Sequence, residues 1–148
     1  METMSQMPSE TMIRAWARLL RAQHTALAKV EAALKAAKLP PLNWYDVLLE
    51  LERSESGLRP AELEREMLMP QYGLSRLLDR IEADGYLARV ALEEDRRGQR
   101  IVITQTGREM RRRMWPVYAG AIGSAVAARL SEDEAAILSG LLAKLIAP

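Results

Sequence analysis

Residues 70–104, PQYGLSRLLDRIEADGYLARVALEEDRRGQRIVIT, contain a change of apolar period that predicts the fold. Before Gly85 the large apolar residues recur at steps of three and four, which predicts a helix with one buried face. Gly85 is a typical helix stop. After it the apolar residues alternate in YLARVAL and RIVIT, which predicts a two-stranded hairpin. We therefore expect a helix that opens at Pro70, buries Leu74, Leu77, Leu78 and Ile81, and leads directly into a hairpin.

Three helices are expected upstream of this stretch. The first runs from about Ser9 to Lys38 and is ended by a pair of prolines. Asn43 suits the N-cap of the second, and Asp46 would lie in its first turn, where a carboxylate favours the helix dipole. The third opens at Pro60 and stops before the proline at 70.

Two further helices are expected downstream. The pairs Thr106–Glu109 and Ser131–Glu134 have the spacing of capping boxes. They would open a long helix to about Leu130 and a final helix to about Ile146. Pro116 lies within the former and is expected to kink it.

Size and composition limit the classes of function. A chain of 148 residues, 49% hydrophobic and 28% charged, fits one globular domain. It has no cysteine, which excludes disulfides, thiolate metal sites and a catalytic thiol. Its one histidine, His24, has no second ligand type clustered near it, so we expect a solvent-facing or interface position and no metal. With no secretory signal and no apolar run that could span a bilayer, we expect no membrane association and a cytoplasmic location.

The order helix, helix, turn, helix, hairpin predicts a winged helix-turn-helix, which is mainly α with a small β-hairpin wing. A helix fits the major groove of duplex DNA, which is about 12 Å wide. The start of the helix from Pro70 is the expected reader, and the alternative is an ordinary amphipathic helix. Gly73 would let the backbone approach DNA, or else merely weaken the helix. The residues expected to contact DNA there are Gln71, Tyr72, Ser75 and Arg76.

The hairpin carries a cluster of arginines in a chain of net charge +1. Arg96, Arg97 and Arg100 are expected at or near its tip, with Gly98 relaxing the turn. A guanidinium there could enter a narrow minor groove, and Asp95 could hold Arg97 in an extended pose. The alternative is a solvated charged hairpin.

The runs SRLLDRIEADGYLARV from Ser75 and DRRGQRIVIT from Asp95 resemble the signature of the multiple antibiotic resistance regulator (MarR) family of bacterial transcription factors. The resemblance covers nearly the whole chain, because the order of helices and wing also agrees. It implies a homodimer that binds a pseudo-palindromic operator and usually represses transcription. By position, Arg97 would be the minor-groove arginine with Asp95 as its buttress. Gln71, Ser75 and Arg76 would face the major groove.

The resemblance also implies an internal division of the single domain. Residues 9–38 and 104–147 would form dimerisation helices, and residues 43–104 would form the DNA-binding lobe. The apolar stripes of the first and last helices support a dimer independently, because they exceed what one small domain can cover. The alternative is that the two stripes pack only against each other.

Many relatives in this family release DNA when a small aromatic anion binds between the dimerisation helices and the lobe. The residues that could line such a site here are Trp16, Trp44, Tyr45, Asp46 and Arg89. Trp16 and Asp46 resemble positions used by the branch that answers urate-like acids. The alternatives are a core or interface role for Trp16 and a helix-start role for Asp46.

Two other classes of function were weighed against a DNA-binding regulator. An enzyme is disfavoured, because the chain has neither a phosphate-binding glycine loop nor a metal-ligand pair, and its histidine has no partner motif. No cofactor is expected. A winged-helix module that binds only protein would keep the fold without needing Arg97 or the exposed residues from Gln71 to Arg76.

Overall fold

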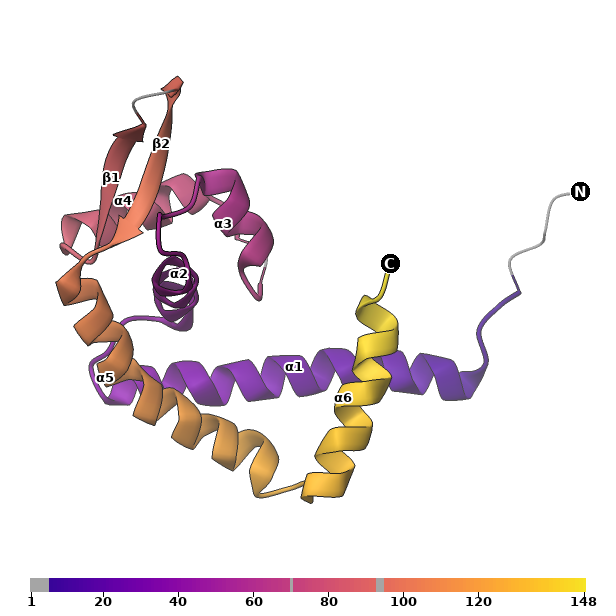
Figure 1. Cartoon of the computed structure of the whole chain (residues 1–148). Helices are drawn as coiled ribbons and strands as arrows, with labels where there is room; N and C mark the ends of the chain where they lie inside the picture. Colours follow the sequence, from indigo (N-terminus) through magenta and orange to yellow (C-terminus); the bar gives the residue numbers. More distant parts are fainter. Residues whose placement is uncertain (1–5, 70, 93–94) are drawn as a thin grey trace, which may run out of the picture. The chain divides into compact units, whose positions relative to one another are not determined.

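The order of elements in the structure is the one expected from the sequence (Figure 1). In the described part of the chain, a two-stranded antiparallel hairpin follows four α-helices and precedes two more, with a π-helical segment between these two. The bounds are α1 Glu10–Ala36, α2 Leu42–Arg53, α3 Pro60–Glu66, α4 Leu74–Ala83, β1 Leu87–Leu92, β2 Asp95–Ile103, α5 Gln105–Ile122, a π-helical segment η1 Gly123–Ala127 and α6 Glu132–Ile146. The predicted fold class is therefore confirmed.

The computed structural model describes residues 6–69, 71–92 and 95–148, with the backbone alone for residues 92 and 95–97. The chain divides into two compact units. Glu31–Gly120 form one unit, which we call the winged lobe. Met1–Val30 and Ala121–Pro148 form the other, which we call the terminal unit. Both α1 and α5 thus contribute residues to each unit.

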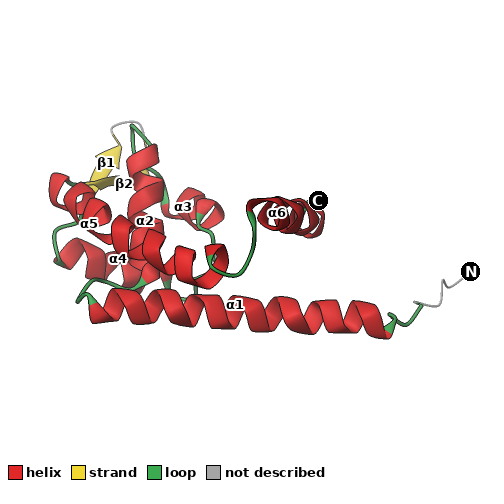
Figure 2. Cartoon of the chain, turned by 90° about the horizontal axis from the view of Figure 1, so that it is seen from below, coloured by secondary structure: helices red, strands yellow, loops and turns green. Residues whose placement is uncertain are grey.

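The winged lobe has a continuous apolar core to which every one of its elements contributes. Figure 2 shows α2, α3, α4 and α5 grouped with the hairpin. The four apolar residues expected on the buried face of α4 are all buried, and Val47, Leu48 and Leu51 of α2 are fully buried. From the remaining elements the core receives Leu34, Leu63, Leu87, Ile101, Met110 and Met114.

The starts of α2 and α4 differ from the sequence prediction. α4 begins at Leu74, because Gly73 before it has the left-handed conformation (φ 72°), which an α-helix cannot contain. Glycine adopts this conformation without strain, so Gly73 is a helix boundary and not a helix residue. Pro70, the predicted first residue, lies outside the described residues. In α2 the N-cap is Pro41 without a side-chain bond, and Asn43 lies inside the helix, so the predicted Asn43 cap is wrong.

The end of α4 joins the hairpin through paired backbone bonds. Gly85 (φ 82°) donates its N–H to the carbonyl of Glu82 at 2.8 Å, and Tyr86 donates to Ile81 at 3.1 Å. These bonds form a Schellman motif, which confirms Gly85 as the stop.

The start of α5 lies close to the same point. The Thr104 hydroxyl donates to the Gly85 carbonyl at 2.6 Å and accepts from the Gly107 N–H at 3.0 Å. Thr104 therefore caps α5, and the prediction of Thr106 as the cap is wrong, since α5 already includes Thr106.

The hairpin pairs Leu87 with Ile103 at its base and has a register shift between Ala91 and Leu92. Figure 1 shows that it extends beyond α3 and α4. β2 begins at Asp95, so Gly98 lies within the strand and not in the turn as predicted. Arg100 lies opposite Val90, several residues from the tip.

The terminal unit contains most of α1, the end of α5, η1 and α6. The α-helical part of α5 contains Pro116 and ends at Ile122, earlier than predicted, and the π-helical segment follows it. The Ser131–Glu134 capping box is confirmed, with the Ser131 hydroxyl accepting from the Glu134 N–H at 3.2 Å. Among the residues that the structure describes, no helix has the length and apolarity needed to cross a membrane.

Candidate DNA-binding surface

The exposed side of α4 offers polar and charged side chains opposite the buried leucines. Ser75 and Arg76 are exposed, as expected, and Tyr72 just before the helix is fully exposed. Asp79 and Arg80 continue the same side one turn further along. Arg80 follows Arg76 by four residues and so lies on the same side of the helix. Arg80 is not among the residues expected from the sequence to contact DNA, although this spacing could have indicated it. These side chains could contact base edges or phosphates from one side of a single helix.

Gln71 is partly buried and is held from α2. The side-chain N–H of Asn43 donates to the Gln71 carbonyl oxygen at 3.3 Å. This bond directs the Gln71 amide NH₂ away from Asn43, where it could donate to a base or a phosphate. The structure thus brings Gln71 together with a residue that the sequence had suggested only as a helix cap.

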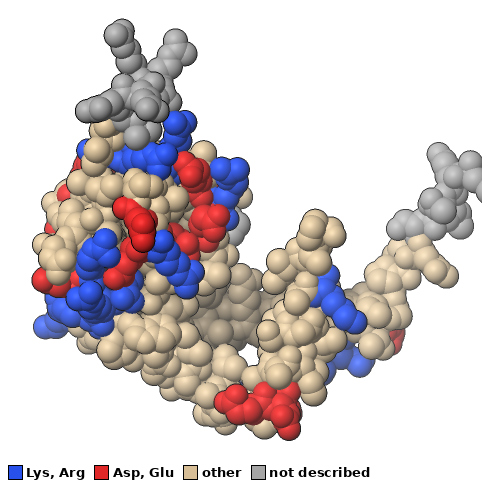
Figure 3. Space-filling view, viewed as in Figure 1, with Lys and Arg blue, Asp and Glu red and all other residues tan. Residues whose placement is uncertain are grey.

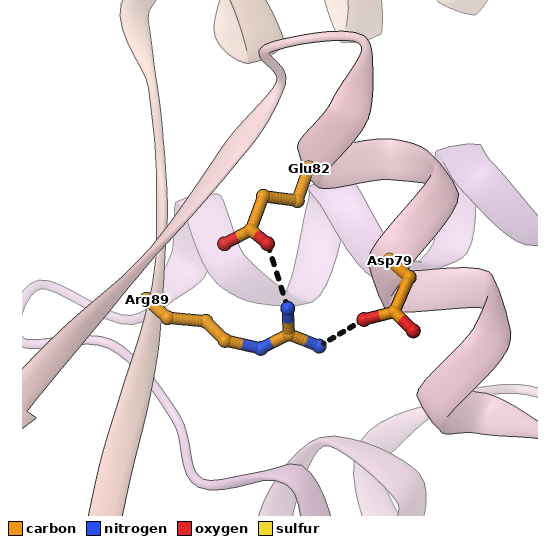
Figure 4. Close-up of polar contacts among 3 residues, drawn as sticks. All are labelled: Asp79, Glu82 and Arg89. Atoms are coloured by element: carbon orange, nitrogen blue, oxygen red, sulfur yellow. Dashed lines mark hydrogen bonds and ion pairs between the residues drawn. The ribbon is translucent and has the colours of Figure 1, made fainter.

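Arg89 lies between the hairpin and α4 (Figure 4). Its guanidinium donates to Glu82 at 2.7 Å and to Asp79 at 2.9 Å. Asp79 and Glu82 are three residues apart on α4, so one planar fork reaches both. The contact joins β1 to α4, and the single positive charge of Arg89 offsets one of the two negative charges close to the exposed side of that helix. This arrangement ties the helix to the wing, whereas the sequence had suggested Arg89 for an effector site.

Arg100 contacts the loop between α2 and α3 rather than projecting at the tip. Its guanidinium donates at 3.3 Å to both the Ser56 hydroxyl and the Gly57 carbonyl. Leu58 and Ile101 exchange backbone bonds beside it, with distances of 3.0 and 2.8 Å. The base of the wing is therefore fixed to the lobe. The side chains of Asp95, Arg96 and Arg97 lie outside the described residues.

Charges of both signs share the visible face of the lobe. Figure 3 shows lysines and arginines interspersed with acidic side chains beneath the hairpin. On α5, Arg108 and Arg111 both contact Glu52 of α2, so two of the bases in the arginine-rich second half of the chain serve the lobe itself. DNA binding through this face would then depend on particular exposed lysines and arginines more than on the net charge.

Asp46 lies in the buried face of α2 and accepts a hydrogen bond from the Leu68 N–H at 2.9 Å. Burial raises the pKa of this carboxyl above its ordinary value, while the N–H groups of Leu68 and Met69 and the charge of Arg53 act in the opposite direction. Leu68 belongs to the turn between α3 and α4. Asp46 thus has a backbone partner in the turn that precedes the reading helix.

The other predicted effector residues have different surroundings. The Trp44 ring packs edge-on against Tyr86 at 6.0 Å between centroids, and Trp16 of the terminal unit is 63% exposed. Tyr45 is buried in an aromatic cluster, with its ring 6.2 Å from Trp115 and 5.0 Å from Tyr118. These last two aromatics were not among the expected site residues, because only the packing of α5 on α2 brings them to Tyr45.

Two further features of the described residues bear on ligands. A cavity of about 390 Å³ is lined by residues between Glu31 and Pro41, and none of the predicted effector residues lines it. His24 is exposed on α1. No cluster of three potential metal-ligating side chains occurs in the described part of the chain.

The protruding hairpin and the exposed side of α4 in one lobe define a winged helix-turn-helix protein. The MarR family model matches residues 38–98. A relative from Bacillus cereus, described as an uncharacterised HTH-type transcriptional regulator, is 30% identical over 130 residues. These residues are 88% of this chain and 85% of the relative. The chain belongs to the MarR family of DNA-binding transcription regulators.

Solved structures of this family have the same fold. Sco3205, a MarR family transcriptional regulator from Streptomyces coelicolor crystallised in complex with DNA, matches with a TM-score of 0.84 and 24% identity. The match covers 95% of this chain and 92% of that one. The organohalide-sensing regulator RdhR, in its 2,4-dichlorophenol-bound form, matches with a TM-score of 0.78 and 20% identity, covering 98% and 88%.

Proposed function

We propose that this protein is a homodimeric repressor that binds a pseudo-palindromic DNA operator in the cytoplasm. The observation that carries the proposal is the presence of an exposed polar helix side and a projecting hairpin in one lobe. The exposed side of α4 suits the major groove, and the projecting hairpin suits the neighbouring minor groove. The complex of Sco3205 with DNA supports this use of the fold.

The homodimer is supported by the apolar surface of the terminal unit. Isolated exposed leucines are ordinary, but here large apolar residues recur along both α1 and α6. A twofold partner would cover them and would place two reading helices about one turn of DNA apart. The exposed set is Met12, Ile13, Trp16 and Leu20 on α1, with Ile137, Leu138, Leu141, Leu145 and Ile146 on α6.

Release from DNA by a small aromatic or phenolic anion is the second part of the proposal. Asp46, with Tyr45 and Tyr118 beside it, links buried aromatic surface to the turn before α4. RdhR, which shares the fold, has been crystallised with 2,4-dichlorophenol. Binding near Asp46 would then change the turn that leads into the reading helix. The residues proposed to respond are Trp16, Trp44, Asp46 and Arg89.

Selection of duplexes from a random pool tests the DNA-binding part. The wild-type protein should enrich a sequence with twofold symmetry, and its affinity should fall by orders of magnitude from low to moderate salt, since several phosphate contacts release counterions. Failure to enrich any duplex would favour the alternative, a module that binds only protein.

The Arg97→Ala variant tests the wing. We expect a loss of about 1–3 kcal/mol per contact in affinity for the selected duplex, because a groove contact is removed. Arg18→Ala, which removes the same charge from an exposed position in α1, is the matched control and should bind almost as the wild type does. Gel-shift titrations in which both variants bind alike would contradict the assignment of Arg97.

The effector part is tested by tryptophan fluorescence and gel shifts with a panel of aromatic carboxylates and phenols. A ligand that quenches fluorescence should also release the selected duplex. A panel that changes neither signal would leave Trp16 and Trp44 with packing roles only.

A further inference from the structure

Two polar side chains on one face of α2 contact the segment that leads into the reading helix. Asn43 and Asp46 are three residues apart, so they lie on the same side of the helix. Asn43 donates to the Gln71 side chain at 3.3 Å, and Asp46 accepts from the Leu68 N–H at 2.9 Å. Leu68 follows α3 by two residues, and Gln71 precedes Gly73 by two. The contacts therefore hold both ends of the turn.

The position of Asp46 is costly for a carboxylate. The residue is only 7% exposed, and an ionised group removed from water loses hydration that hydrogen bonds must replace. Apolar packing alone does not explain an acid here. The backbone bond from Leu68 gives the acid a specific partner, and that partner lies in the turn.

The turn lies between two buried residues, Met67 and Leu74, and of its own described apolar side chains only Met69 is partly buried. Leu68 is 77% exposed and Tyr72 is fully exposed, so neither side chain anchors the turn in the core. By contrast, three apolar residues of α2, from Val47 to Leu51, are completely buried. The buried element is thus α2, and its polar bonds hold Leu68 and Gln71.

We propose that Asn43 and Asp46 are positioning residues that set the backbone at Leu68 and the side chain of Gln71 for reading DNA. The pair, which we call the α2 clamp, orients the Gln71 amide and fixes the backbone at Leu68, so that Tyr72 and Ser75 meet the duplex in one defined pose. Neither residue needs to touch DNA. This inference rests on the proposed DNA-reading role of the α4 surface.

A purely structural role would lower stability without changing the discrimination between DNA sequences. Glu50 provides the matched control, since it is a carboxylate of α2 one turn beyond Asp46 and is almost equally buried, at 9% exposed. Its partner is Arg53 at 3.2 Å, within α2 itself. Loss of Glu50 should therefore affect folding but leave the turn held.

The experiment measures two dissociation constants for each full-length variant, one with the duplex selected by the wild-type protein and one with a shuffled duplex of equal length. Their ratio reports sequence discrimination at a temperature where every variant is folded. For Asp46→Ala we expect this ratio to fall about tenfold, the equivalent of one lost hydrogen bond to a charged group. Asp46→Asn keeps an acceptor oxygen and should retain most of the discrimination. Asn43→Ala should lose about threefold, and Glu50→Ala should match the wild type.

Amide hydrogen exchange of the free protein provides a second measurement that needs no DNA. The Leu68 amide should exchange faster in Asp46→Ala, while amides of α2 keep their protection. Unchanged exchange at Leu68, or an equal loss of discrimination in Asp46→Ala and Glu50→Ala, would overturn the clamp while leaving DNA reading intact. A wild-type protein with no preference for any duplex would instead overturn the proposed function, and the clamp with it.

Discussion

The winged lobe and the terminal unit use similar apolar residues in opposite ways. In the lobe, Leu78 of α4 is 1% exposed, whereas Leu145 of α6 is 70% exposed. Both lie on amphipathic helices whose apolar residues recur at helical spacing. The difference teaches that an apolar stripe establishes only that a surface must be covered. In the lobe, the neighbouring elements of the same chain cover it.

The largest expected effect comes from removing α6. A chain that ends at Arg129 loses the exposed stripe of α6, so we expect monomers or insoluble protein in place of the proposed dimer. Light scattering and solubility measurements would check this. A stable dimer of the shortened chain would show that α6 is not needed to pair two copies.

A matched pair of leucine substitutions would sharpen the comparison between the two units. Leu78→Ala should lower the free energy of unfolding by about 2–5 kcal/mol, because it leaves a cavity in a closed core. Leu141→Ala, at a position 55% exposed, should change the unfolding of the lobe little but weaken self-association. Urea denaturation combined with sedimentation would separate the two effects. If both variants lost equal stability as dilute monomers, Leu141 would be buried within its own chain, as Leu78 is, and the comparison between the two units would fail.

A smaller effect is expected within the lobe from Arg89→Ala. Its carboxylate partners are well exposed, so the lost pairs should cost at most about 1 kcal/mol of stability. Affinity for DNA should fall by more than stability does, because Asp79 and Glu82 would repel phosphates once unpaired. Gel-shift titration at several salt concentrations would test this, and Arg108→Ala is the matched control, since Arg108 pairs with Glu52 of α2 inside the lobe. If Arg89→Ala bound DNA as tightly as the wild type does, the contact between the wing and α4 would have no role in DNA binding.

The smallest effect concerns the pH dependence of stability. Burial raises the pKa of Asp46 in the folded state above 3.8, its ordinary value. The unfolded chain therefore loses this proton first as pH rises, and the contribution of Asp46 to stability, complete below that value, is lost as pH passes the raised pKa. Asp46→Asn lacks this loss, so its stability relative to wild type should increase as the pH rises from 3.8 toward neutrality. The free energy of unfolding of both proteins would be measured by urea denaturation at several pH values across this range. A difference between the two proteins that does not change with pH would contradict the raised pKa of Asp46.

Local patterns predicted most of the elements because they depend on neighbours in the sequence. The buried residues of α4, the stop at Gly85 and the Ser131 capping box all lie within one or two helical turns of their partners. The errors arose where tertiary contacts compete with local preference. Asn43 bonds to Gln71 instead of capping its own helix, and Thr104 caps α5 in place of Thr106 because its hydroxyl also reaches Gly85.

The same division applies to the candidate site. The exposed residues Ser75 and Arg76 could be identified from the sequence, since helical spacing alone sets them opposite the leucines, whereas Tyr72 is exposed in the turn before the helix. The roles of Arg89, Asp46 and Arg100 could not, because each depends on a partner that chain folding brings near. The sequence by itself determined which segments are helices, which are strands, and which family the chain belongs to. Only the tertiary structure decided which charged side chains hold the lobe together and which face solvent, because pairing of charges depends on distances that no local pattern specifies.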